Sequence, residues 1–223
     1  MPQKSKHKLI FEKIRRTFTR VLSCSTRRVI PNNQSWLDFY SPYFSSAQEA
    51  IDFVEQIEAI PAGNPMHRQK ILMHQTQRLV SIAIDLEKIR PRKQALQLAF
   101  LIISCENISK LFHNYEGDMQ SKHYVKKFFE VFVSDEDKAR LRAGFTTHEM
   151  QPMQVVQIVE SLYSIRCDVV HEGKCWGFHF KEDIPMLNID PDMNVYMSFN
   201  ELRDIVVRGS INAINGYSPQ TAP

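Results

Sequence analysis

The chain is organised around one stretch, Leu162-Tyr163-Ser164-Ile165-Arg166-Cys167-Asp168-Val169-Val170-His171-Glu172-Gly173. Apolar residues recur in and before it at spacings of three and four, which predicts a helix with one buried face. Gly173 is placed to end that helix. Arg166 falls within the apolar stripe. Because a guanidinium keeps its charge and is costly to bury unpaired, we expect a carboxylate or a phosphate beside it.

Glu106 is the candidate carboxylate partner of Arg166. It lies in an apolar part of the helix that we expect from about residue 92 to residue 114, and a buried carboxylate also needs a partner. The alternative is that Glu106 faces solvent or pairs with Lys110 at the i,i+4 spacing. A separation of more than about 6 Å between the charged ends of Glu106 and Arg166 would exclude their pairing.

His171 lies at the end of the same predicted helix, about one turn from Arg166. Arg166 and His171, with four residues between them, resemble the Arg-x4-6-His motif of HEPN domains. The string from Leu162 to Gly173 is most similar to the Apea-like branch, and the resemblance covers roughly residues 66–216. It implies an all-α, HEPN-like helical bundle that forms a homodimer. It also implies a metal-independent endoribonuclease with a toxin or antiviral defence role, for which an antitoxin or another regulatory protein is a candidate partner.

The chemistry of RNA cleavage fits these residue types. Cleavage without a metal requires a base for the 2′-hydroxyl, positive charge on the phosphate and a proton donor for the leaving oxygen. His171 can be the base or the acid, and Arg166 can bind the phosphate oxygens, while Asp168 can orient either residue. One histidine is too few for both proton transfers, so a dimer with both motifs in one cleft would complete the site. We expect no cofactor.

A non-catalytic function is the second hypothesis. Many active HEPN members place Asn, Asp, His or Ser directly after the arginine, whereas this chain has Cys167 there. The chain would then be a helical interaction or nucleic-acid-binding module. Arg166 would be a structural ion-pair partner, and His171 a cation favoured by the helix dipole.

A zinc site is the third hypothesis, because Cys and His recur every four residues at Cys167, His171, Cys175 and His179. The glycines at 173 and 177 interrupt any continuous helical face, and a Cys-x2-4-Cys element is missing. We therefore expect no metal. The sequence also lacks a Gly-rich phosphate loop and a Gly-x-Ser-x-Gly elbow, which leaves phosphoryl transfer without support.

The composition is that of a globular helical protein, with 223 residues, 43% hydrophobic and 24% charged residues, and only 7 Gly. No apolar run approaches the roughly 20 residues that cross a bilayer. The basic start lacks the apolar core of a secretory signal, and the four cysteines show no disulfide framework. We expect a cytoplasmic protein without a membrane span.

Residues 1–65 read as a basic N-terminal extension with one or two helices. Its first 30 residues predict an amphipathic helix, whose basic residues are candidates for RNA binding: Lys4, Lys6, Lys8, Lys13, Arg15, Arg16 and Arg20. The alternatives are a solvated helix docked on the domain, an anionic membrane surface or a transit peptide.

The HEPN-like domain is expected at residues 66–216, after a linker between Pro61 and Pro65. Pro91 separates its two long helices, and Ser134 caps a later one. Residues 176–199 predict a small irregular or hairpin insertion before the last helix. We expect a disordered tail at residues 217–223.

Overall fold

The computed structural model describes residues 33–115, 117, 120–175, 178–181 and 193–219. The chain divides into two compact units, Met1–Trp36 and Leu37–Pro223. The predicted N-terminal amphipathic helix and its candidate RNA-binding residues, Lys4, Lys6, Lys8, Lys13, Arg15, Arg16 and Arg20, lie outside the described residues. The contacts that follow belong to the second unit.

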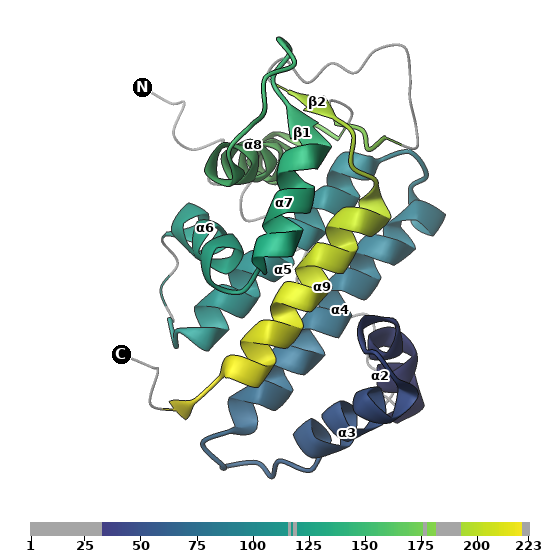
Figure 1. Ribbon diagram of the computed structural model, residues 1–223, viewed down its shortest axis with the longest axis vertical. Helices are drawn as coiled ribbons and strands as arrows, with labels where there is room; N and C mark the ends of the chain where they lie inside the picture. The colour runs from purple at the N-terminus through teal and green to yellow at the C-terminus, as the bar shows by residue number, and fades with distance from the viewer. Residues whose placement is uncertain (1–32, 116, 118–119, 176–177, 182–192, 220–223) are drawn as a thin grey trace, which may run out of the picture. The chain divides into compact units, whose positions relative to one another are not determined.

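The second unit is built almost entirely from α-helices, which confirms the all-α prediction (Figure 1). In chain order the described elements are α2 (Asn33–Tyr40), which begins within the first unit, the 3-10 turn η1 (Ser41–Tyr43), α3 (Ala47–Glu58), α4 (His67–Ile89), α5 (Gln94–Phe112), α6 (Ser121–Val131), α7 (Asp135–Gly144), β1 (Phe145–Thr146), α8 (Val155–Cys167), the π-helical turn η2 (Asp168–Glu172), β2 (Asn194–Val195) and α9 (Phe199–Gly216).

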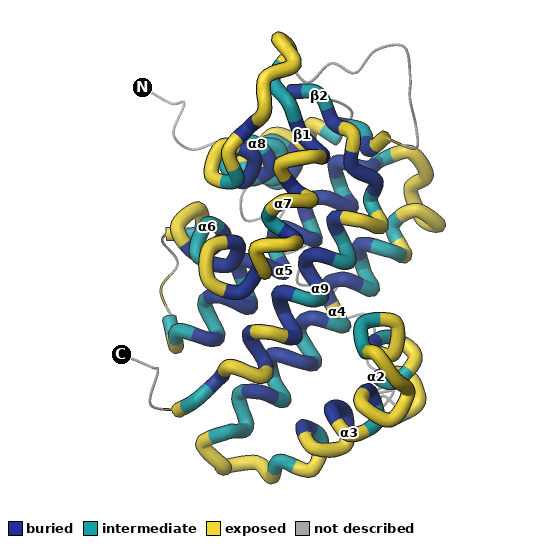
Figure 2. The backbone as a smooth tube through the Cα atoms, in the orientation of Figure 1, coloured by how far each residue is buried: buried dark blue, intermediate teal, exposed yellow. Residues whose placement is uncertain are grey.

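Helix α5 is the centre of this unit, because α4, α6, α8 and α9 all pack against it. Figure 2 shows it buried along most of its length. Among the described helices, α5 alone is long and apolar enough to cross a membrane by length and composition. Leu98, Leu101 and Ile102 are fully buried within the bundle, and the core helix of a folded domain has the same composition.

Helix ends lie where the sequence carries capping or breaking residues. The side chains of Ser46 and Ser134 each accept a hydrogen bond from the backbone N–H three residues later, and Ser198 does the same at the start of α9. Pro91 falls in the break between α4 and α5, as predicted.

The insertion at residues 176–199 was predicted to be irregular or a hairpin, and its described part supplies one strand, β2, to a sheet with an earlier segment of the chain. Strand β2 pairs antiparallel with β1, the segment that follows α7, so that Phe145 lies opposite Val195. Gly144 permits this approach, because a Cβ there would lie 2.9 Å from the Cβ of Met197. The segment after Gly144 is therefore used for strand pairing, and α8 begins later, at Val155.

Two segments outside the predicted 66–216 domain also belong to the packed core. Helix α3 buries Val54 and Ile57, and its last residue, Glu58, forms ion pairs with Lys70 and His74 of α4. At the other end, Tyr217 is buried and packs its ring against Phe112. The prediction of a disordered tail is therefore wrong for Tyr217, because the Phe112 ring offers it an apolar site.

Candidate functional site

Arg166 lies in the last turn of α8 and forms an ion pair with Glu106 of α5. Arg166 Nη2 is 3.0 Å from Glu106 Oε2, which confirms the predicted pairing. The other oxygen, Glu106 Oε1, accepts a hydrogen bond from Lys110 Nζ at 2.8 Å. The two alternatives weighed for Glu106 are therefore both present, and one carboxylate binds two cations.

This triad of Arg166, Glu106 and Lys110 is largely desolvated, with side-chain exposures of 14%, 11% and 18% respectively. Its net charge is +1, since two cations share one carboxylate. Arg166 Nε is also buried and has no hydrogen-bond partner among the described residues. The triad therefore holds a net positive charge in a largely desolvated place, where its attraction for an anion is stronger than in bulk water.

Tyr163 contacts the same guanidinium from one turn earlier on α8. The Cζ atom of Arg166 lies 5.6 Å from the centroid of the Tyr163 ring, a cation–π geometry. Burial raises the pKa of the Tyr163 hydroxyl, and a hydrogen bond with the Cys167 thiol raises it further. Tyr163 therefore stays protonated at neutral pH. Cys167, the residue directly after Arg166, thus contacts Tyr163.

The turn that carries His171 is π-helical, which the sequence did not predict. In an α-helix, positions five apart are rotated by about 140° from each other. A π turn is closed by hydrogen bonds between residues five apart, so it brings positions 166 and 171 closer to one side of the helix. Gly173 ends the turn with φ of 69°, and Lys174 N–H donates to the Asp168 carbonyl at 3.2 Å. The exposed His171 is thus held one turn beyond the triad.

Asp168 does not pair with Arg166, and the four Cys and His residues considered for zinc form no metal site among the described residues. Among the described residues the Asp168 carboxylate makes no hydrogen bond or ion pair with Arg166. Cys167, His171, Cys175 and His179 are all described, and no group of three or more His, Cys, Asp or Glu in the described ranges lies close enough to hold a metal ion.

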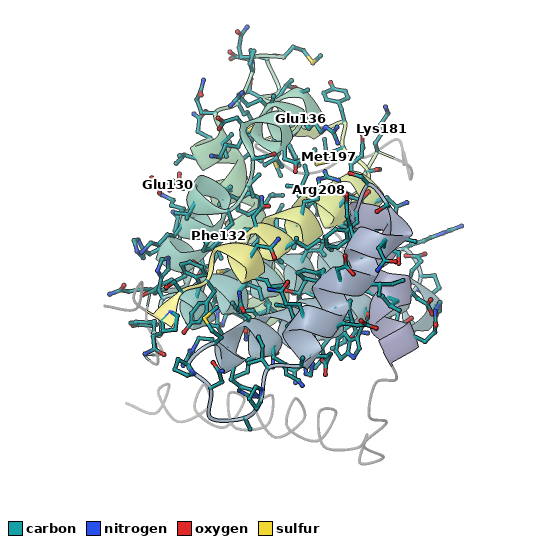
Figure 3. All side chains as sticks on the ribbon, turned by 60° about the horizontal axis from the view of Figure 1, so that its bottom comes forward. Glu130, Phe132, Glu136, Lys181, Met197 and Arg208 are labelled. Atoms are coloured by element: carbon teal, nitrogen blue, oxygen red, sulfur yellow. The ribbon has the colours of Figure 1, made fainter. Side chains whose placement is uncertain are left out.

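A cavity of about 320 Å³ lies elsewhere in the unit, between α7, the two residues that follow β2 and the first half of α9. Arg208, which lines it, donates two hydrogen bonds to Asp137, at 2.8 Å and 2.7 Å. Figure 3 labels Arg208 and Met197 at this place. Its acidic groups are engaged as well, since Glu201 accepts from Ser198 N–H and Asp204 from the Tyr43 hydroxyl.

Comparison with known proteins adds no relative. No family model matches this chain, and no curated protein or solved structure is detectably similar to it.

Proposed function

We propose that the protein is a metal-independent endoribonuclease of the HEPN type that acts as a homodimer. The observation that carries the proposal is the buried guanidinium of Arg166, held by Glu106 and reinforced by Lys110, one turn before the exposed His171. This arrangement places phosphate-binding charge and an exposed imidazole at one helix end.

Each residue has a defined role in this proposal. Arg166 binds the non-bridging oxygens of the scissile phosphate through the N–H groups that Glu106 leaves unused, and Lys110 adds positive charge. His171 removes the proton of the 2′-hydroxyl, which attacks the phosphorus and displaces the 5′-oxygen. The His171 of a second copy donates the proton that the leaving oxygen takes up. The products are a 2′,3′-cyclic phosphate and a 5′-hydroxyl.

Glu106 is a positioning residue in this scheme. Its carboxylate fixes the plane of the guanidinium before RNA binds, so little ordering is needed when the phosphate arrives. It also keeps the two neighbouring cations, Arg166 and Lys110, from repelling each other in a largely desolvated place.

The test is cleavage of a mixed RNA pool by the full chain in EDTA. Wild-type protein should cleave, whereas Arg166→Ala and His171→Ala should lose at least about a hundredfold in rate, as expected for loss of an acid–base or charge-stabilising group. Arg78→Ala and His67→Ala, on α4, are the matched controls and should retain full rate. Cleavage that survives in both site variants, or that EDTA abolishes, would contradict the proposal.

The second candidate function is a non-catalytic HEPN-like interaction or nucleic-acid-binding module. The direct ion pair between Arg166 and Glu106 favours it, because the guanidinium already has a carboxylate partner. Cys167 beside Arg166 favours it too. In that case Arg166→Ala would reduce stability, and wild-type protein would leave every RNA in the pool intact. A role in defence or in toxin–antitoxin regulation belongs to the first candidate and depends on its activity.

A further inference from the structure

A second cluster of two cations and one carboxylate lies where α6 packs on α8. Lys122 and Lys126 of α6 reach the same oxygen of Glu160 on α8, at 2.9 Å and 2.6 Å. Hydrogen bonds from Lys126 and then Lys122 lower the pKa of Glu160 to about 2, so its carboxylate stays ionised at neutral pH. Like the triad around Glu106, this cluster carries a net charge of +1, but its lysines are far more exposed, at 51% and 35%.

An aromatic platform lies beside the triad of Arg166, Glu106 and Lys110. Lys110 Nζ is 5.8 Å from the centroid of the Tyr115 ring. The Tyr115 ring lies 4.7 Å from the ring of Tyr124 at an interplanar angle of 33°, and Tyr124 is buried in α6. Tyr124 therefore supports a partly exposed Tyr115 ring, which is the kind of surface on which an unpaired base stacks.

These three features lie on, or directly after, three helices that pack against one another, since α5 packs on both α6 and α8, and α6 packs on α8. We call the set Arg166, Lys110, Tyr115, Lys122 and Lys126 the cationic–aromatic strip. Lys127 adds charge close by, since it lowers the pKa of His113. Among the residues that the structure describes, Glu106 and Glu160 are the carboxylates that pair with the four cations of the strip.

We propose that the cationic–aromatic strip binds single-stranded RNA and leads it to Arg166. Lys122 and Lys126 bind backbone phosphates, one base stacks on Tyr115, and the strand continues past Lys110 to the scissile phosphate. A duplex cannot use the platform because its base faces are covered by stacking. This inference rests on the proposed ribonuclease function, and it adds the form of the substrate and the residues that hold it away from the cut.

The test measures binding in a chain that does not cut, the full-length His171→Ala variant. Fluorescence anisotropy follows a short unstructured fluorescein-labelled RNA, and the same RNA annealed to its complement, over a range of salt concentrations. Lys122→Gln/Lys126→Gln removes two phosphate contacts and Tyr115→Leu removes the platform. Arg78→Gln/Lys88→Gln on α4 is the control that removes the same charge elsewhere.

Binding of the single strand should weaken about fivefold or more in Tyr115→Leu, which is the loss of one stacked base. In the lysine pair the slope of log K against log salt should become shallower by about 1.4, or 0.7 for each phosphate. The control pair should change the slope by less than half of that. Equal binding by the lysine pair and the control pair would contradict the proposal that the strip binds single-stranded RNA. Unaltered binding by Tyr115→Leu, or tighter binding of the duplex than of the single strand, would contradict it too.

The two proposals fail separately. If wild-type protein cuts no RNA but the strip variants lose single-strand binding, RNA binding by the strip is supported and the ribonuclease function is contradicted. If wild-type protein cuts RNA and the strip variants bind and cut it as well as the control pair does, the ribonuclease function is supported and RNA binding by the strip is contradicted.

Discussion

Arg166 and Glu106 lie sixty positions apart in the chain, yet their side chains form a 3.0 Å ion pair between α8 and α5. The same carboxylate holds Lys110 of its own helix. The pair therefore ties the motif helix to the central helix of the bundle, and it does so with one negative charge for two positive ones. Removal of the carboxylate and removal of either cation should have very different consequences.

Glu106→Gln should lower the free energy of unfolding by about 3 kcal/mol, because it leaves two largely buried cations side by side without an anion. Lys110→Met should cost about 1 kcal/mol or less, since it keeps the Arg166–Glu106 pair and replaces the ammonium with an apolar group. Urea denaturation of both variants measures the difference. Equal losses would mean that Glu106 carries no special electrostatic role.

The sequence was sufficient for features that depend on local spacing. The apolar stripe around Arg166 and the isolated Glu106 in an apolar helix each implied a missing partner, and they proved to be partners of each other. The cap at Ser134 and the break at Pro91 were equally local. Each follows from one residue type at one position in a periodic pattern.

Features that depend on how helices pack could not be predicted from spacing. Lys122 and Lys126 belong to one helix and Glu160 to another, so only the packing of α6 on α8 joins them. The pairing of β1 with β2 is likewise set by tertiary approach at Gly144. The π turn before Gly173 is marked by no particular residue type, which is why the sequence predicts a motif helix that is regular to its end.

Gly173→Ala should destabilise the protein by about 1 kcal/mol and should also lower RNA cleavage. Gly173 has φ of 69°, and a methyl group added to its Cα would meet no atom within 4 Å, so the cost is that of the backbone conformation alone. The turn that it ends carries His171, so strain at Gly173 displaces the proposed base. Thermal unfolding and cleavage rate are measured together.

Gly63→Ala is the matched control for Gly173→Ala, because Gly63 has φ of 87° and equally open surroundings. It should lose a similar amount of stability and keep its cleavage rate. If both glycine variants lose activity to the same extent, the effect of Gly173 is one of general stability rather than of the π turn.

Arg208→Met should lower the free energy of unfolding by about 3 kcal/mol, because it leaves a buried carboxylate without its main partner. Asp137 has a side-chain exposure of 5% and receives two hydrogen bonds from Arg208. Lys88→Met on α4 is the control. Its ion pair with Asp85 is exposed, and such pairs contribute about 0–1 kcal/mol. Calorimetric unfolding of the two variants should separate them clearly, and similar melting temperatures would contradict the buried role of Asp137.

His113 should make stability depend on pH in the acid range. Burial lowers the pKa of its imidazole below the ordinary 6.5, and the nearby charges of Lys127 and His123 lower it further. The unfolded chain therefore binds a proton more readily than the folded chain. The stabilising contribution is complete above about pH 6.5 and is lost as the pH falls through the folded pKa.

His113→Asn removes this titration and is compared with wild type by urea unfolding at several pH values between about 5 and 7.5. Wild type should lose more stability than His113→Asn as the pH falls. NMR should show that the pKa of the His113 imidazole is lower in the folded protein than in the protein unfolded by urea. Lys127→Gln should shift the His113 pKa back upward, because it removes a cation that opposes protonation. A folded pKa above 6.5, or an unchanged pKa in Lys127→Gln, would contradict the assigned cause.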